Sequence, residues 1–336
     1  DEVKVVQEAM WRHNAFIYTL YLNYTTLNGN LDGVTANAFA AFVADGALAD
    51  NKSKHCRAAD LDLIGIEVNT LSGKYDAQRA AESKKPGAKK IVSRYQKHQL
   101  GREEFLFCLV KVAVQMFMRS GELNSLSEAL DRLLQHLEAS MGNVVKDDPD
   151  VFRSKYAYRQ DVCEVLIRNE EALRTVFKYI SSAGSSHKVK FDQIDQREWM
   201  NMLRHIGMID SDLPERDALR CFSWSRMAVE DPITHRGHRK ETELPFEGFL
   251  EALCRIAVLK ALPTDEELLA SGFATASQFL GALQEQGGQD YQHFMLTHQH
   301  IWGNEVDEPF AHRVEHTVDM FKVMVEFNRK TKVKQH

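Results

Sequence analysis

The chain has 336 residues and a mass of 38.4 kDa, with 44% hydrophobic and 27% charged residues, which is typical of a folded protein and unlike a disordered one. Its net charge of −6 argues against a surface that binds nucleic acid throughout. No apolar run approaches the ~20 residues of a membrane-spanning helix, and no signal peptide is recognisable, so we expect a cytoplasmic protein without a membrane partner.

The five cysteines are widely spaced and form no Cys-x-x-Cys pair. This spacing predicts free thiols in a reducing compartment, with Cys108 and Cys254 buried inside apolar helices. Only seven prolines interrupt a sequence rich in Ala, Leu, Glu, Lys and Arg. The composition therefore favours an all-α fold.

Apolar residues at helical spacing predict the elements of the first half, beginning with a helix over Val3–Tyr24. A polar turn at Asn28–Gly33 ends this helix. The elements expected next are a helix through Phe39 and Phe42 that stops near Gly46, a helix over Arg57–Val68, an irregular stretch over Thr70–His98, and helices over Phe105–Met118 and Ser125–Leu137. The segment 141–150 is charged, contains Pro149 and reads as a linker.

After this segment the pattern of the first half starts again. Leu173, Val176, Phe177 and Ile180 repeat the spacing of Ile17, Leu20, Tyr21 and Tyr24. The segment from Leu100 through Glu103-Glu104-Phe105-Leu106 aligns with the segment from Leu244 through Glu247-Gly248-Phe249-Leu250. We interpret the matches as an internal duplication, with domains over 1–140 and 151–262.

Each half has the outline of two EF-hand units, in which a loop of about twelve residues joins two helices. In such a loop an apolar residue near the end pairs as a short strand with the partner loop, and an aromatic residue five positions later enters the core. Four pairs of residues have this spacing of five positions: Val34 and Phe39, Leu100 and Phe105, Ile194 and Trp199, and Leu244 and Phe249. The pattern predicts two tandem EF-hand-pair-like helical domains.

The calcium ligands of an EF-hand are mostly missing. Calcium needs oxygen ligands at loop positions one, three and five and a bidentate acid at position twelve. Position twelve holds Ala38, Glu104, Glu198 and Gly248 in the four loops. The early positions are Ser93, Tyr95 and Lys97 in the second loop, His187, Val189 and Phe191 in the third, and Gly237, Arg239 and Glu241 in the fourth. A shifted register could use Asn28, Asn30, Asp32 and Gly33, but it places Phe39 at position twelve. We expect no metal site and no cofactor, and keep a calcium-responsive EF-hand regulatory module as the alternative.

Three segments, namely Phe39–Asp45, Cys56–Val68 and Leu100–Ala113, resemble the core of the tubulin polymerisation-promoting protein family. The segments Leu173–Phe177 and Phe249–Ala257 resemble degenerate EF-hand repeats of ciliary and flagellar axonemal proteins. A basic insert between Val68 and Leu100, near residues 70–98, departs from the first family. The resemblance implies a non-catalytic structural component of the axoneme that binds tubulin in the microtubule lattice and other axonemal proteins.

Basic residues are the candidate contacts with the acidic surface of tubulin. The densest cluster is Lys84, Lys85, Lys89, Lys90, Arg94 and Lys97, and a second group near the C-terminus is Arg329, Lys330, Lys332 and Lys334. Both could equally be solvated charge without a partner, and for the C-terminal group this is the favoured interpretation.

The segment 263–336 is expected to be a helical C-terminal extension. Thr264 followed by Asp265-Glu266-Glu267 predicts a capped helix start, and a helix is expected over Glu308–Asn328. The helix over Glu308–Asn328 either folds back on the second domain, which we favour, or docks on a neighbouring protein. His312-Arg313-Val314-Glu315-His316 fits the His-x-x-Glu-His pattern of inverted zinc peptidases, but an acid well downstream to complete the site is missing. With no phosphate-binding loop or nucleophile elbow either, we expect no catalytic residues.

Overall fold

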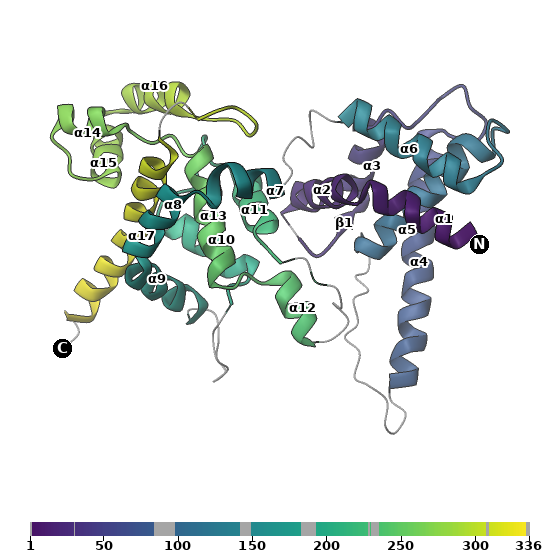
Figure 1. The fold of residues 1–336 in the computed structure, drawn as a ribbon, viewed down its shortest axis with the longest axis horizontal. Coiled ribbons are helices and arrows are strands. Elements are labelled where there is room, and N and C mark those ends of the chain that lie inside the picture. Colours follow the sequence, from purple (N-terminus) through teal and green to yellow (C-terminus); the bar gives the residue numbers. More distant parts are fainter. Residues whose placement is uncertain are drawn as a thin grey trace. The chain divides into compact units, whose positions relative to one another are not determined.

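The computed structural model describes residues 2–29, 31–83, 98–141, 149–182, 193–227, 229, 235–306 and 309–333. Seventeen α-helices and one two-stranded sheet make up most of the regular structure of these residues (Figure 1). The all-α fold class is confirmed. Among the described residues, no helix combines the length and the apolar character needed to cross a membrane.

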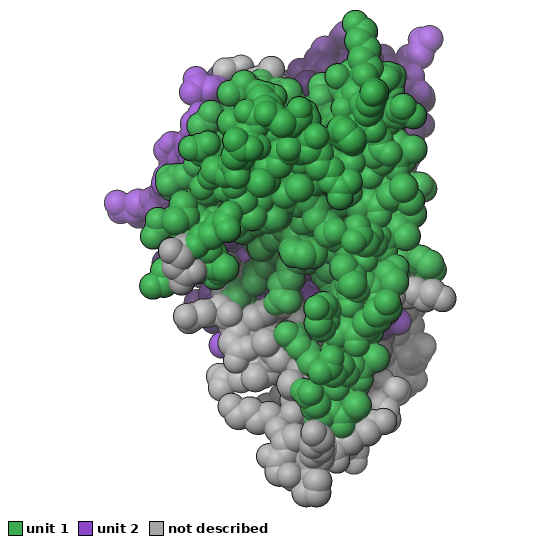
Figure 2. Space-filling model, turned by 90° about the vertical axis from the view of Figure 1, so that its right-hand side faces the viewer, with its two compact units in different colours: residues 1–148, 229–239 green, residues 149–228, 240–336 purple. Residues whose placement is uncertain are grey.

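The chain divides into two compact units (Figure 2). The first comprises residues 1–148 and 229–239, and the second comprises residues 149–228 and 240–336. The segment 263–336, which the sequence set apart as an extension, therefore belongs to the second unit. The chain passes between the units three times, and helix α12 (His235–Thr242) contains the last of these points.

The first unit contains six α-helices among its described residues up to Met141. They are α1 (Glu2–Arg12), α2 (Asn14–Thr25), α3 (Ala36–Asp45), α4 (Ala58–Ser83), α5 (Arg102–Ala113), which continues as a π-turn over Val114–Met118, and α6 (Leu126–Met141). The helix expected over Val3–Tyr24 is interrupted at His13, whose φ of −107° and ψ of 17° are not helical. A short 3-10 turn over Thr26–Asn28 follows α2.

The irregular stretch expected over Thr70–His98 was a wrong prediction for its first part, because helix α4 continues to Ser83. The part of α4 after Thr70 lacks an apolar stripe, so periodicity gave no signal. It has no proline, and three of its residues from 71 to 83 are Ala, the residue that most favours helix by intrinsic propensity. This part of α4 extends beyond the other helices of its unit (Figure 1).

An aromatic cluster forms the centre of the first unit. Phe42 packs against Tyr24, Phe39 and Phe105 with ring centroids 5.4 to 5.7 Å apart. The side chains of Phe39, Phe42 and Phe105 are nearly or completely buried. Cys108, in the same core, is buried as predicted, and burial raises the pKa of its thiol to about 12.

The second unit is also built from helices around aromatic residues. Its helices are α7 (Pro149–Phe152), which continues as a π-turn over Arg153–Ala157, α8 (Gln160–Arg168), α9 (Glu170–Ser182), α10 (Gln196–His205), α11 (Glu215–Trp224), α13 (Phe246–Leu259), α14 (Asp265–Ser271), α15 (Ala276–Gln286), α16 (Gly288–His298) and α17 (Phe310–Val333). Phe249 contacts Phe177, Trp199 and Phe321. Cys254 is buried as predicted.

In each unit, one short antiparallel backbone pairing joins two loops. Strand β1 (Val34–Thr35) pairs with β2 (Gln99–Leu100), with Val34 opposite Leu100. In the second unit Ile194 and Leu244 exchange both backbone hydrogen bonds at 2.8 Å. These four residues are the ones that the sequence placed at the pairing position of each loop.

Helix α17 folds back onto the second unit and packs against α13, α9 and α8. Arg313, fully buried, donates from Nε to the Ala257 carbonyl oxygen at 2.9 Å and from Nη2 to that of Lys260 at 2.6 Å. Carbonyls at a helix C-terminus have no partner within their own helix. The Arg313 guanidinium, which belongs to α17, thus supplies hydrogen-bond donors to carbonyl oxygens at the C-terminal end of α13.

Replacing Arg313 by Met is expected to lower the unfolding free energy of the second unit by about 3 kcal/mol, since charge-assisted hydrogen bonds to two buried carbonyls are lost. Urea unfolding followed by tryptophan fluorescence measures this, because three of the four tryptophans, Trp199, Trp224 and Trp302, belong to that unit. The control is Arg168→Met, which removes an exposed ion pair with Glu315 at 2.8 Å and should cost at most about 1 kcal/mol. Equal losses for both variants would contradict the capping role.

Candidate functional site

The ends of the four loops decide whether this chain could bind calcium in the manner of an EF-hand. In the first loop, position twelve is Ala38, a buried methyl group whose backbone N–H donates to Thr35 Oγ1 at 3.3 Å. In the second loop, the Glu104 carboxylate accepts a hydrogen bond from the hydroxyl of Ser72 in α4. This carboxylate thereby ties α5 to α4. In the shifted register of the first loop, position twelve is Phe39, which is buried in the aromatic core.

The loop ends of the second unit are also occupied. Glu198 and Asp195 form a capping box: Asp195 N–H donates to Glu198 Oε2 at 2.9 Å, and Glu198 N–H donates to Asp195 Oδ1 at 2.7 Å. Burial raises the pKa of Glu198. At Gly248, an added Cβ would lie 2.7 Å from the Ser225 carbonyl oxygen. This position therefore has no room for any side chain.

The described residues contain no group of three or more His, Cys, Asp or Glu side chains arranged to hold a metal ion. The two imidazoles of the zinc-peptidase pattern instead share one carboxylate. His312 Nδ1 lies 2.6 Å and His316 Nε2 3.0 Å from opposite oxygens of Asp265. Glu315, which would be the general base of such an enzyme, pairs with Arg168.

A cavity of about 740 Å³ lies in the first unit beside the paired strands. We call it the α4 groove, and it is lined by Val34, Phe39, Gly65, Ile66, Gly73 and Leu100 together with polar residues along α4. Most of its wall is apolar, and the 59% exposed side chain of Ile66 stands at its edge. A cavity of this size is in the range of binding sites for ligands and peptide segments.

Asn69 fixes the corner where α4 meets β2. Its amide Nδ2 donates to the Gln99 carbonyl oxygen at 2.6 Å, and its Oδ1 accepts from the His98 N–H at 3.1 Å. His98 has a φ of 67°, in the left-handed region, so the chain turns sharply there. Sequence reasoning missed Asn69, although a polar residue at the end of an apolar helical stripe is the signal that could have found it.

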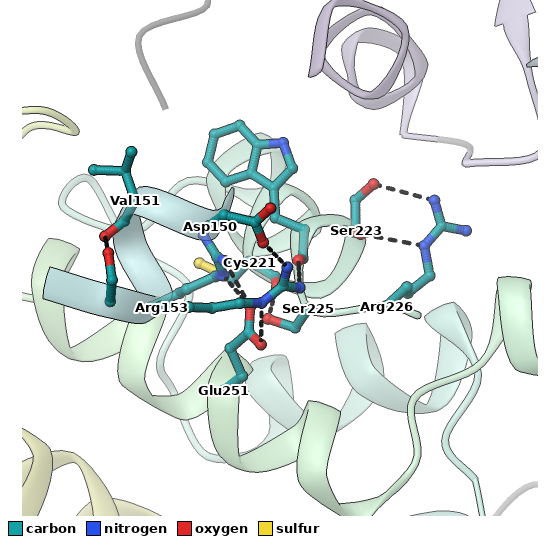
Figure 3. Close-up of polar contacts among 11 residues, drawn as sticks. Asp150, Val151, Arg153, Cys221, Ser223, Ser225, Arg226 and Glu251 are labelled. Carbon is teal, nitrogen blue, oxygen red and sulfur yellow. Dashed lines mark hydrogen bonds and ion pairs between the residues drawn. The ribbon is translucent and has the colours of Figure 1, made fainter. Parts of the chain in front are cut away.

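A charge cluster around the buried side chains of Glu251 and Arg255 joins α7, α11 and α13 in the second unit (Figure 3). Glu251 accepts from Arg153 Nε at 2.9 Å and from Arg255 Nη2 at 2.6 Å. Arg153 also donates to Asp150 Oδ1 at 2.7 Å and to the Trp224 carbonyl oxygen. Burial lowers the pKa of Arg255, whose guanidinium lies 4.1 Å from the Phe152 ring centre. The cluster pairs its charges internally, which is the arrangement of a structural network.

The structure does not describe the side chains of the basic residues singled out from the sequence. Lys84, Lys85, Lys89, Lys90, Arg94, Lys97 and Lys334 lie outside the described residues, and of Arg329, Lys330 and Lys332 only the backbone, within α17, is described. Comparison with family models, with curated proteins and with solved structures found no match.

Replacing Gly248 by Ala should destabilise the second unit by about 2 kcal/mol, because the new methyl group overlaps a backbone carbonyl that cannot move away cheaply. The matched control is Gly281→Ala in α15, where nothing lies within 4 Å of the added Cβ. There the higher helix propensity of Ala should stabilise by up to about 1 kcal/mol. Chemical denaturation of the full chain compares the two, and a stable Gly248→Ala protein would show that the position is open after all.

Proposed function

We propose that this chain is a non-catalytic structural protein made of two EF-hand-like pairs of helix-loop-helix units that do not use calcium. The observation that carries this proposal is the pairing of Val34 with Leu100 and of Ile194 with Leu244, the positions at which EF-hand loops pair. The occupied loop ends support the part that concerns calcium. Ala38 and Gly248 offer no carboxylate. The Glu104 carboxylate accepts from Ser72 of α4, and the Glu198 carboxylate accepts from the Asp195 N–H at the start of α10.

The proposed partner is tubulin in the microtubule lattice, with other axonemal proteins, in the cytoskeleton of a cilium or flagellum. The support for this partner comes from the sequence, namely the resemblance of Phe39–Asp45 and Leu100–Ala113 to a tubulin-binding family and the basic cluster from Lys84 to Lys97. A basic segment on a chain of net charge −6 can engage an acidic lattice locally while the rest of the surface repels it.

Co-sedimentation of the full chain with microtubules, with calcium chelated and in excess, tests the proposal. We expect calcium-independent pelleting that weakens several-fold when the ionic strength is raised from about 0.05 to about 0.2 M, because salt screens exposed charges. Binding that requires calcium would favour the regulatory module instead, and absence of binding under all conditions would contradict the proposed partner.

Neutralising the basic cluster locates the contact. A variant with Lys84, Lys85, Lys89 and Lys90 changed to Gln should bind at least about tenfold more weakly, since four attractive charges are lost. The control variant removes the same number of exposed cations elsewhere, by changing Lys52, Lys54, Lys178 and Arg197 to Gln. Equal weakening in both variants would show that only net charge matters and that the cluster is not a contact.

A further inference from the structure

The α4 groove has an open side that follows one helix. Asp62, Ile66, Thr70, Lys74 and Ala77 line it from α4, in steps of three or four residues that place them along one face of the helix. From Asp62 to Ala77 this face extends about 22 Å at 1.5 Å per residue. The opposite face of α4 carries the buried residues Leu61, Ile64 and Val68.

Small residues make the floor of the groove shallow enough for a backbone to approach. Gly65, Gly73 and Ala77 all line it. At Gly65, an added Cβ would lie 3.2 Å from the Phe39 ring, so α4 packs closely on α3 at this position. Ala36 and Ala40 of α3 line the opposite wall. A segment lying in the groove could therefore contact α4 and α3 at once.

The polar residues of the groove give it two charged ends. Asp62 lies near the start of α4, and Lys74 follows twelve residues later, about 18 Å along the helix axis. Within the part of the chain that the structure describes, neither Asp62 nor Lys74 takes part in an ion pair. An occupant should therefore have a positive end beside Asp62 and a negative end beside Lys74.

We propose that the α4 groove binds an amphipathic α-helix of a partner protein, antiparallel to α4, with acidic residues in its first turn and basic residues in its last. An antiparallel helix brings its first turn to Lys74 and its last to Asp62. This charge order is also the one that a helix dipole favours. The walls from α3 and α4 offer apolar side chains and backbone groups already bonded within helices. An extended peptide bound there would lose the hydrogen bonds between its backbone and water and gain none from these walls. A helix makes its backbone hydrogen bonds internally and does not have this cost.

A fluorescent sixteen-residue peptide is the probe. It carries two Glu in its first turn, Leu at positions 3, 7, 10 and 14, two Lys in its last turn and Ala elsewhere. Its control has Lys first and Glu last with the same Leu residues. Fluorescence anisotropy with the full chain should give at least about tenfold tighter binding for the first peptide. Equal binding of both, or binding of neither at millimolar protein, would overturn the proposal.

Two sets of variants place the peptide. Gly73→Leu fills the groove and should weaken binding at least tenfold, whereas Gln78→Leu adds the same side chain to α4 outside the groove lining and should change little. The double variant Asp62→Lys, Lys74→Glu should reverse the preference between the two peptides, and circular dichroism verifies that it folds. An unchanged preference in this variant would contradict the antiparallel placement. None of these residues is altered in the microtubule experiment, so either proposal can fail without the other.

Discussion

The backbone pairing between loops is the constraint on which the arrangement of both units depends. Two hydrogen bonds of 2.8 Å between Ile194 and Leu244, and the equivalent pairing of Val34 with Leu100, fix where four helices begin. Because Phe39, Phe105, Trp199 and Phe249 each follow a paired residue by five positions, the pairing also delivers one aromatic side chain per loop to the core. Gly33 has to be small for the same reason, since an added Cβ there would lie 2.8 Å from the Leu100 carbonyl oxygen.

The sequence predicted elements and buried residues correctly where apolar side chains recur with a fixed period and a polar segment separates one such run from the next. The burial of Leu173, Val176, Phe177 and Ile180, the cap at Thr264 and the four pairing residues were all readable in this way. The second half of α4 was not, because a helix held by propensity leaves no periodic trace. Contacts between distant segments were not readable either. Nothing local in the sequence joins Arg313 to the end of α13, Ser72 to Glu104, or Asn69 to the start of β2.

The same limit explains what the sequence missed of the candidate site. The α4 groove exists because α4 continues past Val68 and carries Gly73 and Ala77 where larger residues would close it. With an irregular segment at that place, as the sequence led us to expect, the groove would not form, so it could not be predicted. The four residues that pair between loops, by contrast, were correctly predicted, since their spacing to the next aromatic residue is local information. What the structure adds is that the carboxylates of Glu104 and Glu198 accept hydrogen bonds, from Ser72 and from the Asp195 N–H, that a bound metal ion would have to break.

The last described helix has a consequence for how the chain acquires its structure during synthesis. Phe321 of α17 contacts Phe249 of α13. At the end of α13, the buried Lys260 pairs with Asp212 at 2.8 Å, and its carbonyl oxygen accepts a hydrogen bond from Arg313 of α17. The second unit thus cannot close its core while α17 is still inside the ribosome. The helices up to Met141 leave the ribosome far earlier and can pack first. Until α17 has been synthesised, therefore, α9 and α13 expose an apolar surface that only this later segment covers.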